Sequence, residues 1–303
     1  MKSFLLKVLI FSILVIGLIL SFICYHQIKY SNITRWNNSE TESNLLVMSE
    51  EKSYDLLFLG ASNARVLSRN SNHQEVQENL GKSIINLAQG GGRGGVVKNY
   101  TYLSYFFKKN NSTKHIIYFL PPQTLFTNNY DQLKMDVEPF SFDFLMHSKK
   151  AGLDNRTLLN YVQSKFTHNW ISKIPEKPNV KSLSRIDSSA IAKNISNWAR
   201  YEEESPASFE DKLKYLSKII DLSEKYNCKL SFVFQVNLMG ENFPHLLEVK
   251  RELNNLQTMF NFQIYDLSNE MTDPSFYYDH MHLNSEGVIH FSKNVLSPII
   301  EES

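Results

Sequence analysis

The feature that most constrains this chain is an uninterrupted apolar segment close to the N-terminus. Residues 8–25 carry no charged side chain. As a helix, a segment of this length reaches roughly 27 Å at about 1.5 Å per residue, close to the roughly 30 Å hydrocarbon core of a bilayer. Leu, Ile and Phe fall on every side of such a helix, which is atypical of a helix in a globular core. We therefore expect residues 1–30 to form a membrane-spanning helix.

Two kinds of N-terminal segment fit this pattern, a cleaved signal peptide and an uncleaved signal anchor. No small-x-small cleavage site follows the apolar segment, and Cys24 follows Phe22 and Ile23, a poor match to a lipoprotein processing site. We favour the signal anchor. The short N-terminal tail carries Lys2 and Lys7, so we expect it to stay in the cytoplasm and the rest of the chain to lie on the extracytoplasmic side.

The remainder of the chain divides into a polar segment and one large domain. Residues 31–52 are rich in Asn, Ser, Thr and Glu, which indicates a tether between membrane and domain. Residues 53–303 can bury a sizeable core, because 42% of the chain is hydrophobic and 13% aromatic. The formal net charge of +1 gives no indication of a nucleic-acid partner. Cys24 and Cys228 are too different in context to predict a disulfide.

Short apolar segments alternate with segments of helical periodicity along the domain. The expected strands are residues 54–60, 83–88, 115–120, 229–236 and 262–267. The expected helices are residues 96–108, 210–226 and 244–260, and a last one that begins near Ser285. Such alternation predicts an α/β fold, a three-layer sandwich in which a central parallel sheet of about five strands has helices on both faces. Ligands bind such sheets at the carboxyl ends of the strands.

Residues 127–206 interrupt this alternation. The segment is aromatic, with Phe140, Phe142 and Phe144 among its side chains, and shows no strand pattern. We interpret it as a helical insertion. It fits a lid over a site and a peripheral packing element equally well.

Ser62 is the candidate nucleophile. It follows the first expected strand at the start of a helix, where its hydroxyl is exposed and backbone N–H groups lie nearby. A serine hydroxyl also needs a base that is oriented by an acid, and N–H donors for the oxyanion. Taken alone, Ser62 is better explained as a helix N-cap.

Asp279 and His282 provide the missing acid and base. They are three residues apart on a loop before the last helix, so both side chains can point into one cleft. A metal site is a competing interpretation, with Asp279, His280 and His282 as ligands. No further His or Cys cluster would complete the metal's ligands, so we expect no metal.

Three sequence blocks resemble the SGNH (GDSL-like) hydrolase family. Residues 60–62 are similar to its first block, which holds the nucleophilic serine, and residues 86–91 to its second, which contributes a glycine N–H to the oxyanion hole. Residues 279–284 are similar to its fifth block, Asp-x-x-His followed by Leu-Asn. The blocks occur in the family's order. The resemblance implies a flavodoxin-like sheet in which Asp279 orients His282 and His282 takes the proton of Ser62, with His280 a bystander.

The resemblance also implies an oxyanion hole, and here the sequence departs from the family. The expected donors are Ser62, Gly91, with Gly90 as an alternative, and Gln123. The family places an Asn after the third strand, but this chain has Pro121, Pro122 and then Gln123. Proline donates no backbone hydrogen bond, and loss of one oxyanion donor costs roughly 10²–10³ in rate.

The resemblance is to the membrane-anchored branch of the family, which includes polysaccharide O-acetyltransferases and the protein that works in D-alanylation of teichoic acid. It implies an esterase or O-acyltransferase that needs no cofactor and acts on a cell-surface or secreted glycan through an acyl-serine. Because an exported protein has no acyl-CoA pool, a membrane-bound acyl-donor partner is a further expectation for the transferase. The alternative is a degenerate, non-catalytic domain that binds glycan or scaffolds a cell-envelope assembly. Gly90, Gly92 and Gly95 also match a dinucleotide fingerprint, but no acid follows about twenty residues later.

Overall fold

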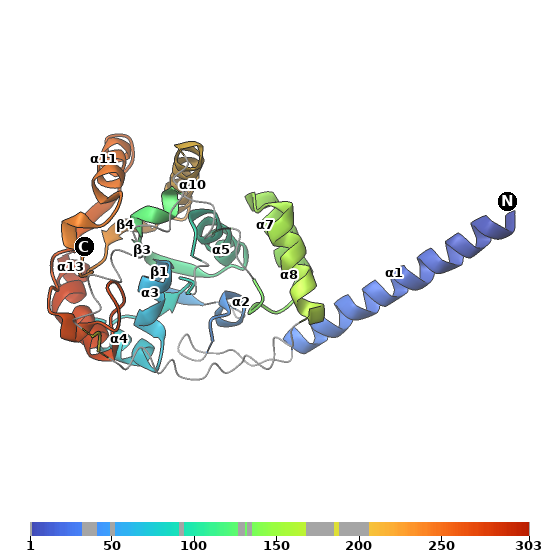
Figure 1. Ribbon diagram of the computed structural model, residues 1–303, viewed down its shortest axis with the longest axis horizontal. Helices are drawn as coiled ribbons and strands as arrows, with labels where there is room; N and C mark the ends of the chain where they lie inside the picture. The colour runs from blue at the N-terminus through green and yellow to red at the C-terminus, as the bar shows by residue number, and fades with distance from the viewer. Residues whose placement is uncertain are drawn as a thin grey trace.

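The protein has an α/β fold built on a five-stranded, all-parallel sheet. The computed structural model describes residues 2–31, 41–48, 52–90, 94–126, 131, 135–167, 185–187 and 206–302. The strands are β1 (Ser53–Gly60), β2 (Ile84–Asn86), β3 (Ser112–Phe119), β4 (Lys229–Phe234) and β5 (Gln263–Asp266). Their order in the sheet is β2-β1-β3-β4-β5, and every neighbouring pair is parallel. Figure 1 labels the three central strands, β1, β3 and β4. The predicted α/β class and parallel sheet of five strands are confirmed.

The strands are apolar almost throughout because the sheet is buried on both faces. Alternate side chains of each strand enter two separate hydrophobic clusters. Leu57 of β1 and Phe232 of β4 belong to one cluster, whereas their neighbours Phe58 and Val233 belong to the other. All four side chains are at most 1% exposed.

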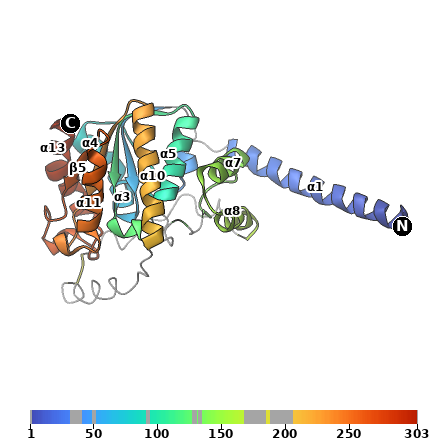
Figure 2. The same ribbon diagram turned by 90° about the horizontal axis from the view of Figure 1, so that it is seen from above.

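Helices cover both faces of the sheet, as Figure 2 shows. The first cluster is covered by α5 (Val96–Lys108), α10 (Pro206–Lys225) and α11 (Leu246–Gln257). The second is covered by α3 (Ser62–Arg65), α4 (Asn72–Leu80), α12 (Ser285–His290) and α13 (Ser297–Glu302), with the short elements η1 (Val66–Ser68) and η8 (Phe291–Leu296). Loops at the carboxyl ends of the strands contain η2 (Pro122–Leu125), η6 (Gly240–Asn242) and η7 (Pro274–Phe276).

The longest helix, α1 (Lys2–Ser31), projects from the domain. Among the described residues, its segment Ser3–Tyr25 is the one stretch long and apolar enough to cross a membrane. The expected membrane-spanning helix is therefore present as a candidate span. Two further helices, α7 (Phe142–Ala151) and α8 (Asn155–Thr167), lie on the side of the domain from which α1 projects (Figures 1 and 2).

Residues 41–48 differ from the expected tether. All eight are buried, and the segment contains a short helix, α2 (Asn44–Val47). The Glu138 carboxylate accepts hydrogen bonds from the Ser43 hydroxyl at 2.6 Å and from the Asn44 and Leu45 backbone N–H groups at 3.0 Å each. This part of the range 31–52 is thus an integral part of the domain. Its polar composition suggests a solvated linker, but the Ser43 hydroxyl, the Asn44 side-chain NH₂ group and the backbone N–H groups of Asn44 and Leu45 all find acceptors inside the protein.

Candidate active site

Ser62 is the first residue of α3, directly after the sharp turn at Gly60 and Ala61 that ends β1. The strand ends at Gly60, whose φ of 144° disfavours any residue with a side chain. A Cβ at this position would also lie 2.6 Å from the carbonyl oxygen of Phe119 on β3. Gly94 approaches the same turn so closely that a Cβ there would collide with the Cα of Ala61. The close packing of these glycines leaves Ser62 at the end of the strand, where its side chain is partly exposed.

The loop before α12 is held in a defined conformation by hydrogen bonds at both ends. Tyr277 and Leu283 form an isolated antiparallel bridge, and the buried Tyr277 hydroxyl donates to the carbonyl of Met271 at 2.7 Å. Asn284 is the N-cap of α12: its side-chain oxygen accepts from the Gly287 N–H at 2.9 Å, and its amide donates to the Ser275 carbonyl at 2.8 Å. The residues between these ends are therefore presented on a fixed turn.

The structure brings the three predicted catalytic residues together. The Oγ of Ser62 lies 2.7 Å from Nε2 of His282, although the two residues are 220 positions apart in the chain. The other ring nitrogen, Nδ1, lies 2.7 Å from Oδ2 of Asp279. Both distances are within hydrogen-bond range, and each ring nitrogen meets a different partner. Serine, imidazole and carboxylate therefore form the continuous chain that nucleophilic catalysis by serine requires.

The Asp279 carboxylate is held in its ionised form. Burial raises its pKa, but the hydrogen bond and the charge interaction with His282, and the backbone N–H groups of Met281 and His282, outweigh burial and lower it. These N–H groups donate to Oδ1 at 2.9 and 2.8 Å, leaving Oδ2 for the imidazole. The neighbouring His280 has a lowered pKa because it is buried. Its carbonyl accepts from the Leu238 N–H at 2.9 Å, which attaches the loop after β4 to the catalytic loop.

The structure places the predicted oxyanion donors differently from one another. Gly91 lies outside the described residues. The N–H of Gly90, the alternative, donates to Oε2 of Glu42 at 3.3 Å and so points at a carboxylate in this structure. Gln123 and Ser62 follow neighbouring strands at the same edge of the sheet. Gly60 at the end of β1 pairs with Phe119 at the end of β3, and the chain continues from these residues to Ser62 and to Gln123. Gln123 is 2% exposed, and among the described residues no hydrogen bond joins it to the triad.

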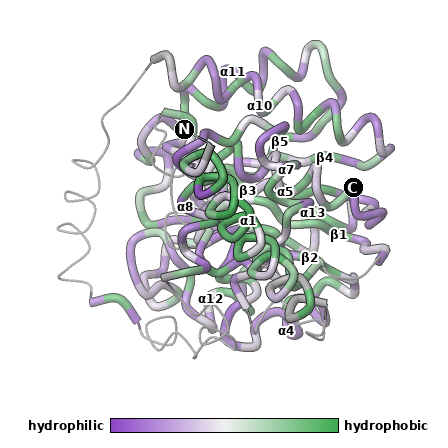
Figure 3. The backbone as a smooth tube through the Cα atoms, turned by 90° about the vertical axis from the view of Figure 1, so that its right-hand side faces the viewer, coloured by the Kyte–Doolittle hydropathy of each residue, from purple (hydrophilic) through white to green (hydrophobic). Residues whose placement is uncertain are grey.

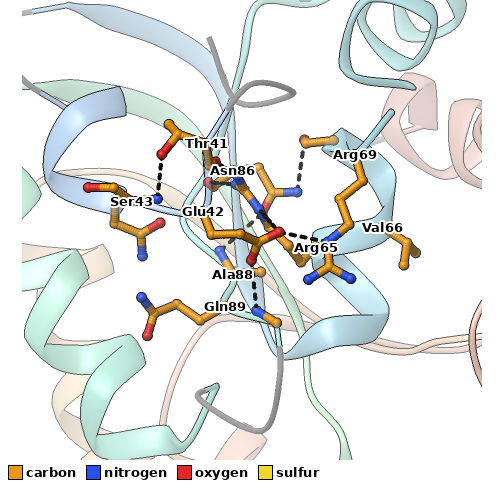
Figure 4. Close-up of polar contacts among 12 residues, drawn as sticks. Thr41, Glu42, Ser43, Arg65, Val66, Arg69, Asn86, Ala88 and Gln89 are labelled. Atoms are coloured by element: carbon orange, nitrogen blue, oxygen red, sulfur yellow. Dashed lines mark hydrogen bonds and ion pairs between the residues drawn. The ribbon is translucent and has the colours of Figure 1, made fainter. Parts of the chain in front are cut away.

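A buried ion-pair network lies beside the triad and was missed by reasoning from the sequence (Figure 4). Glu42 is 4% exposed; its Oε1 is 2.6 Å from Nε of Arg69 and 3.3 Å from Nε of Arg65. Burial by itself raises the pKa of Glu42, but the two guanidinium groups lower it to about 2. Arg65 also donates to the carbonyls of Asn86 at 3.1 Å and of Thr41. Glu42 therefore joins the segment after α1 to the helix that carries Ser62.

The network reaches the catalytic base through Tyr278. Arg69 forms a side-chain hydrogen bond with Tyr278, whose pKa is raised mainly by burial. The Tyr278 ring stacks on the His282 ring with centroids 5.4 Å apart and an interplanar angle of 7°. The Tyr278 N–H also donates to the His282 carbonyl at 3.1 Å. No sequence pattern predicts this series of contacts to His282, because Glu42 and Arg69 are ordinary charged residues in polar segments.

A narrow pocket adjoins the catalytic elements at the carboxyl ends of β3 and β4. Asn63 and Met281, the chain neighbours of Ser62 and His282, line it together with Pro121, Phe243 and Gln235. Gln235 is 6% exposed, and neither its side-chain oxygen nor its nitrogen has a hydrogen-bond partner among the described residues. The side-chain oxygen of Asn63 likewise has none. A buried amide without a partner is costly, so these side chains need an explanation that the described residues do not supply.

Other chemistries find less support in the geometry. Within the described part of the chain, no three His, Cys, Asp or Glu side chains are arranged to hold a metal ion. The glycine run of the dinucleotide fingerprint is described only at Gly90, Gly94 and Gly95.

A comparison of the chain with models of known protein families and with curated proteins found no match.

Proposed function

We propose that this protein is a membrane-anchored, extracytoplasmic serine acyl-esterase or O-acyltransferase that forms an acyl-Ser62 intermediate. The hydrogen-bonded chain Ser62–His282–Asp279, with 2.7 Å at each step, is the observation that carries the proposal. Ser62 and His282 are far apart in sequence but lie within hydrogen-bond distance, and the Asp279 carboxylate bonds to the other ring nitrogen, where it can fix the tautomer of the imidazole. The helix-cap interpretation of Ser62 does not hold, because the N-cap of α3 is Ala61. A cap would also leave the imidazole and the carboxylate behind Ser62 unexplained.

In the proposed reaction, Ser62 Oγ attacks the acyl carbonyl while its proton moves to Nε2 of His282. The tetrahedral intermediate collapses, and His282 returns the proton to the departing oxygen of the donor. A hydroxyl of the acceptor, or water, then gives its proton to His282 and attacks the acyl-serine. The bond between the acyl carbon and Ser62 Oγ breaks, and His282 returns the proton to Oγ, which restores the free Ser62 and a neutral imidazole. Throughout, Asp279 keeps the imidazole oriented and stabilises its protonated form.

The SGNH interpretation of the fold agrees with the strand order. The order β2-β1-β3-β4-β5 is the one that flavodoxin-like sheets have, and such sheets bind ligands at the carboxyl ends of their strands. Ser62, Gln123 and the pocket beside Gln235 all follow strand ends. The oxyanion hole in this proposal consists of the Ser62 N–H and the glycine loop after β2, with Gln123 in the place of the family's Asn.

The proposed substrate is a cell-surface or secreted glycan. As an esterase the protein would remove an acyl group from this glycan, and as a transferase it would add one that comes from a membrane-bound donor partner. The candidate span Ser3–Tyr25 supports this placement, because it would hold the domain close to the bilayer surface. An enzyme outside the cytoplasm has no acyl-CoA pool, so an activated acyl group must come across the membrane.

Residues 185–187, which belong to the expected insertion, contact the loop that carries Asp279 and His282. The Ile186 N–H donates a hydrogen bond to the Tyr277 carbonyl at 2.7 Å.

The test uses the full-length chain in detergent micelles. Hydrolysis of p-nitrophenyl acetate and labelling by a fluorophosphonate probe are measured for the wild type, Ser62→Ala, and the control Ser217→Ala on α10. Turnover and labelling should vanish in Ser62→Ala and persist in Ser217→Ala. If the folded wild type and Ser62→Ala behave alike in both assays, the catalytic proposal is wrong and the degenerate, glycan-binding alternative takes its place.

A second measurement separates transferase from esterase. The acyl-enzyme is followed by intact-protein mass spectrometry after mixing with p-nitrophenyl acetate, with and without an added glycan hydroxyl acceptor. An acyl-Ser62 adduct that persists in water and is discharged by the acceptor supports a transferase. An adduct that water discharges equally fast supports an esterase.

A further inference from the structure

The α7–α8 hairpin carries an exposed apolar surface that the proposed chemistry does not use. Four large hydrophobic side chains are well exposed there: Phe142 (52%), Met146 (45%), Leu159 (65%) and Phe166 (64%). Phe142 and Met146 are four residues apart on α7, and Leu159 and Phe166 are seven apart on α8, so each pair forms a stripe along its helix. We call these four residues the hairpin face.

The opposite sides of the two helices pack into the domain. Phe144 of α7 and Tyr161 of α8 are fully buried, and their rings meet edge-on with centroids 5.9 Å apart. The Tyr161 hydroxyl donates to the Pro139 carbonyl at 2.6 Å and accepts from the Ser141 N–H at 2.7 Å. The hairpin is therefore a rigid part of the domain, and its exposed stripes are held in place.

The apolar helix α1 meets this hairpin directly. The Phe22 and Phe166 rings are stacked, with centroids 4.0 Å apart and an interplanar angle of 10°. Phe22 also lies 6.2 Å from the ring of Phe140. Figure 3, which views the molecule from the side of α1, shows α1 as a hydrophobic rod beside α8.

This contact determines the depth of the hairpin relative to a membrane. The candidate span ends at Tyr25, so Phe22 lies three residues, or about 4.5 Å, inside that end. A bilayer that encloses the span therefore reaches Phe166. Interfacial helices bury their apolar faces by about 5–10 Å, so the same bilayer surface can receive the hairpin face.

Basic residues border the hairpin face. Lys149 and Lys150 lie in the last turn of α7, and Arg156 lies in the first turn of α8, three residues before Leu159; all three are exposed. Long basic side chains with apolar neighbours are typical of helices at the level of lipid headgroups, particularly anionic ones.

We propose that the α7–α8 hairpin is a second membrane contact, which lies in the headgroup region of an anionic bilayer and fixes the orientation of the catalytic domain. The apolar stripes enter the upper acyl region, while Lys149, Lys150 and Arg156 contact lipid phosphates. With one flexible anchor, the domain could rotate freely relative to the bilayer. Two contacts joined at Phe22 and Phe166 present one side of the domain to the membrane.

The experiment places a fluorescent label at single cysteines of the full-length chain in vesicles. In a Cys24→Ala, Cys228→Ala background, Phe142→Cys, Met146→Cys, Leu159→Cys and Phe166→Cys are labelled with an environment-sensitive nitrobenzoxadiazole dye. Leu247→Cys and Met259→Cys are matched controls, since these side chains are 69% and 68% exposed elsewhere on the domain. The native Cys24, labelled in Cys228→Ala, reports insertion of α1. Circular dichroism verifies the fold of each variant.

Spin-labelled lipids then report contact with the bilayer. The four hairpin labels should lose fluorescence when doxyl lipids are included, and the loss should be greater in vesicles that contain phosphatidylglycerol than in phosphatidylcholine alone. The labels at 247 and 259 should keep their fluorescence. If the Cys24 label is quenched and the hairpin labels are not, the proposal is overturned while α1 remains an anchor. Hairpin labels that shift to the blue without lipid quenching would show that a protein covers the face, which also overturns it.

Discussion

The carboxylate of Glu42 lies 2.6 Å from Nε of Arg69, and this pair connects the segment after the apolar helix to the catalytic base. Arg69 bonds to Tyr278, and Tyr278 stacks on His282. This chain of contacts means that residues of the segment after α1 help to hold the imidazole. It also concentrates buried charge at one place, which makes the stability of the protein depend on pH.

Replacement of Glu42 by Gln should destabilise the protein strongly at neutral pH. Loss of Glu42 leaves the buried Arg65 and the partly buried Arg69 without their counter-charge, and breaking a buried pair costs about 3–5 kcal/mol. The folded-state pKa of Glu42 is lowered from 4.5 to about 2, so its contribution is complete above pH 4.5 and disappears as the pH falls towards 2. Thermal unfolding of both proteins from pH 7 to pH 3 measures this. A difference in stability that stays constant across the range would contradict it.

Tyr278 should affect catalysis through its ring more than through its hydroxyl. Tyr278→Phe keeps the stack on His282 and loses the bond to Arg69, whereas Tyr278→Ala loses both. An aromatic pair is worth about 0.5–1.5 kcal/mol, so Tyr278→Ala should lower kcat by up to about tenfold relative to Tyr278→Phe. The control is Tyr226→Ala, which removes a ring stacked on Phe107. Equal kcat values for the two Tyr278 variants would refute the role of the stack.

Asp279→Asn should keep the fold and lose most of the activity. An amide oxygen can still accept from the Met281 and His282 N–H groups, but the negative charge behind the imidazole is gone. In a serine triad this loss costs on the order of 10⁴ in kcat. Hydrolysis of p-nitrophenyl acetate measures it, with Asp273→Asn, the N-cap of η7, as the control that should stay near wild type. Activity within tenfold of the wild type would show that Asp279 does not orient the base.

Gln235→Leu should leave stability unchanged or raise it while lowering kcat/KM. The buried amide of Gln235 has no partner among the described residues, so an apolar side chain removes a desolvation cost of about 1–3 kcal/mol. If the amide instead serves an acyl group beside Ser62, turnover falls. Asn237→Leu is the contrasting variant, because Asn237 already bonds to the Met239 N–H at 2.8 Å and its loss should destabilise the protein. Unchanged kcat/KM in Gln235→Leu would exclude the pocket from the reaction.

Much of the scaffold could be predicted because it depends on local patterns. The apolar segments at 54–60 and 229–236 predicted β1 and β4 to within two residues at each end. The expected helix at 96–108 has the bounds of α5, and the helix expected near Ser285 is α12. Hydrophobic periodicity and a glycine at the end of a strand can be recognised from neighbouring residues alone, so contacts between distant parts of the chain are not needed to predict these elements.

The buried segment 41–48 shows where local patterns fail. Its Thr, Glu, Ser and Asn residues have the composition of a solvated tether. They are buried because Arg65, Arg69 and Glu138, all distant in sequence, satisfy their charges and hydrogen bonds. The environment of a polar side chain is set by partners that a local window does not contain.

The sequence by itself determined the apolar helix and the alternation of strands and helices, and it singled out Ser62, Asp279 and His282 as candidates, because each depends on residue type and short-range spacing. Only the tertiary structure decided that Ser62 Oγ and His282 Nε2 lie 2.7 Å apart, that Glu42 joins this site, and that Phe22 stacks on Phe166. Those contacts join residues 220, 27 and 144 positions apart, and chain packing alone brings them together.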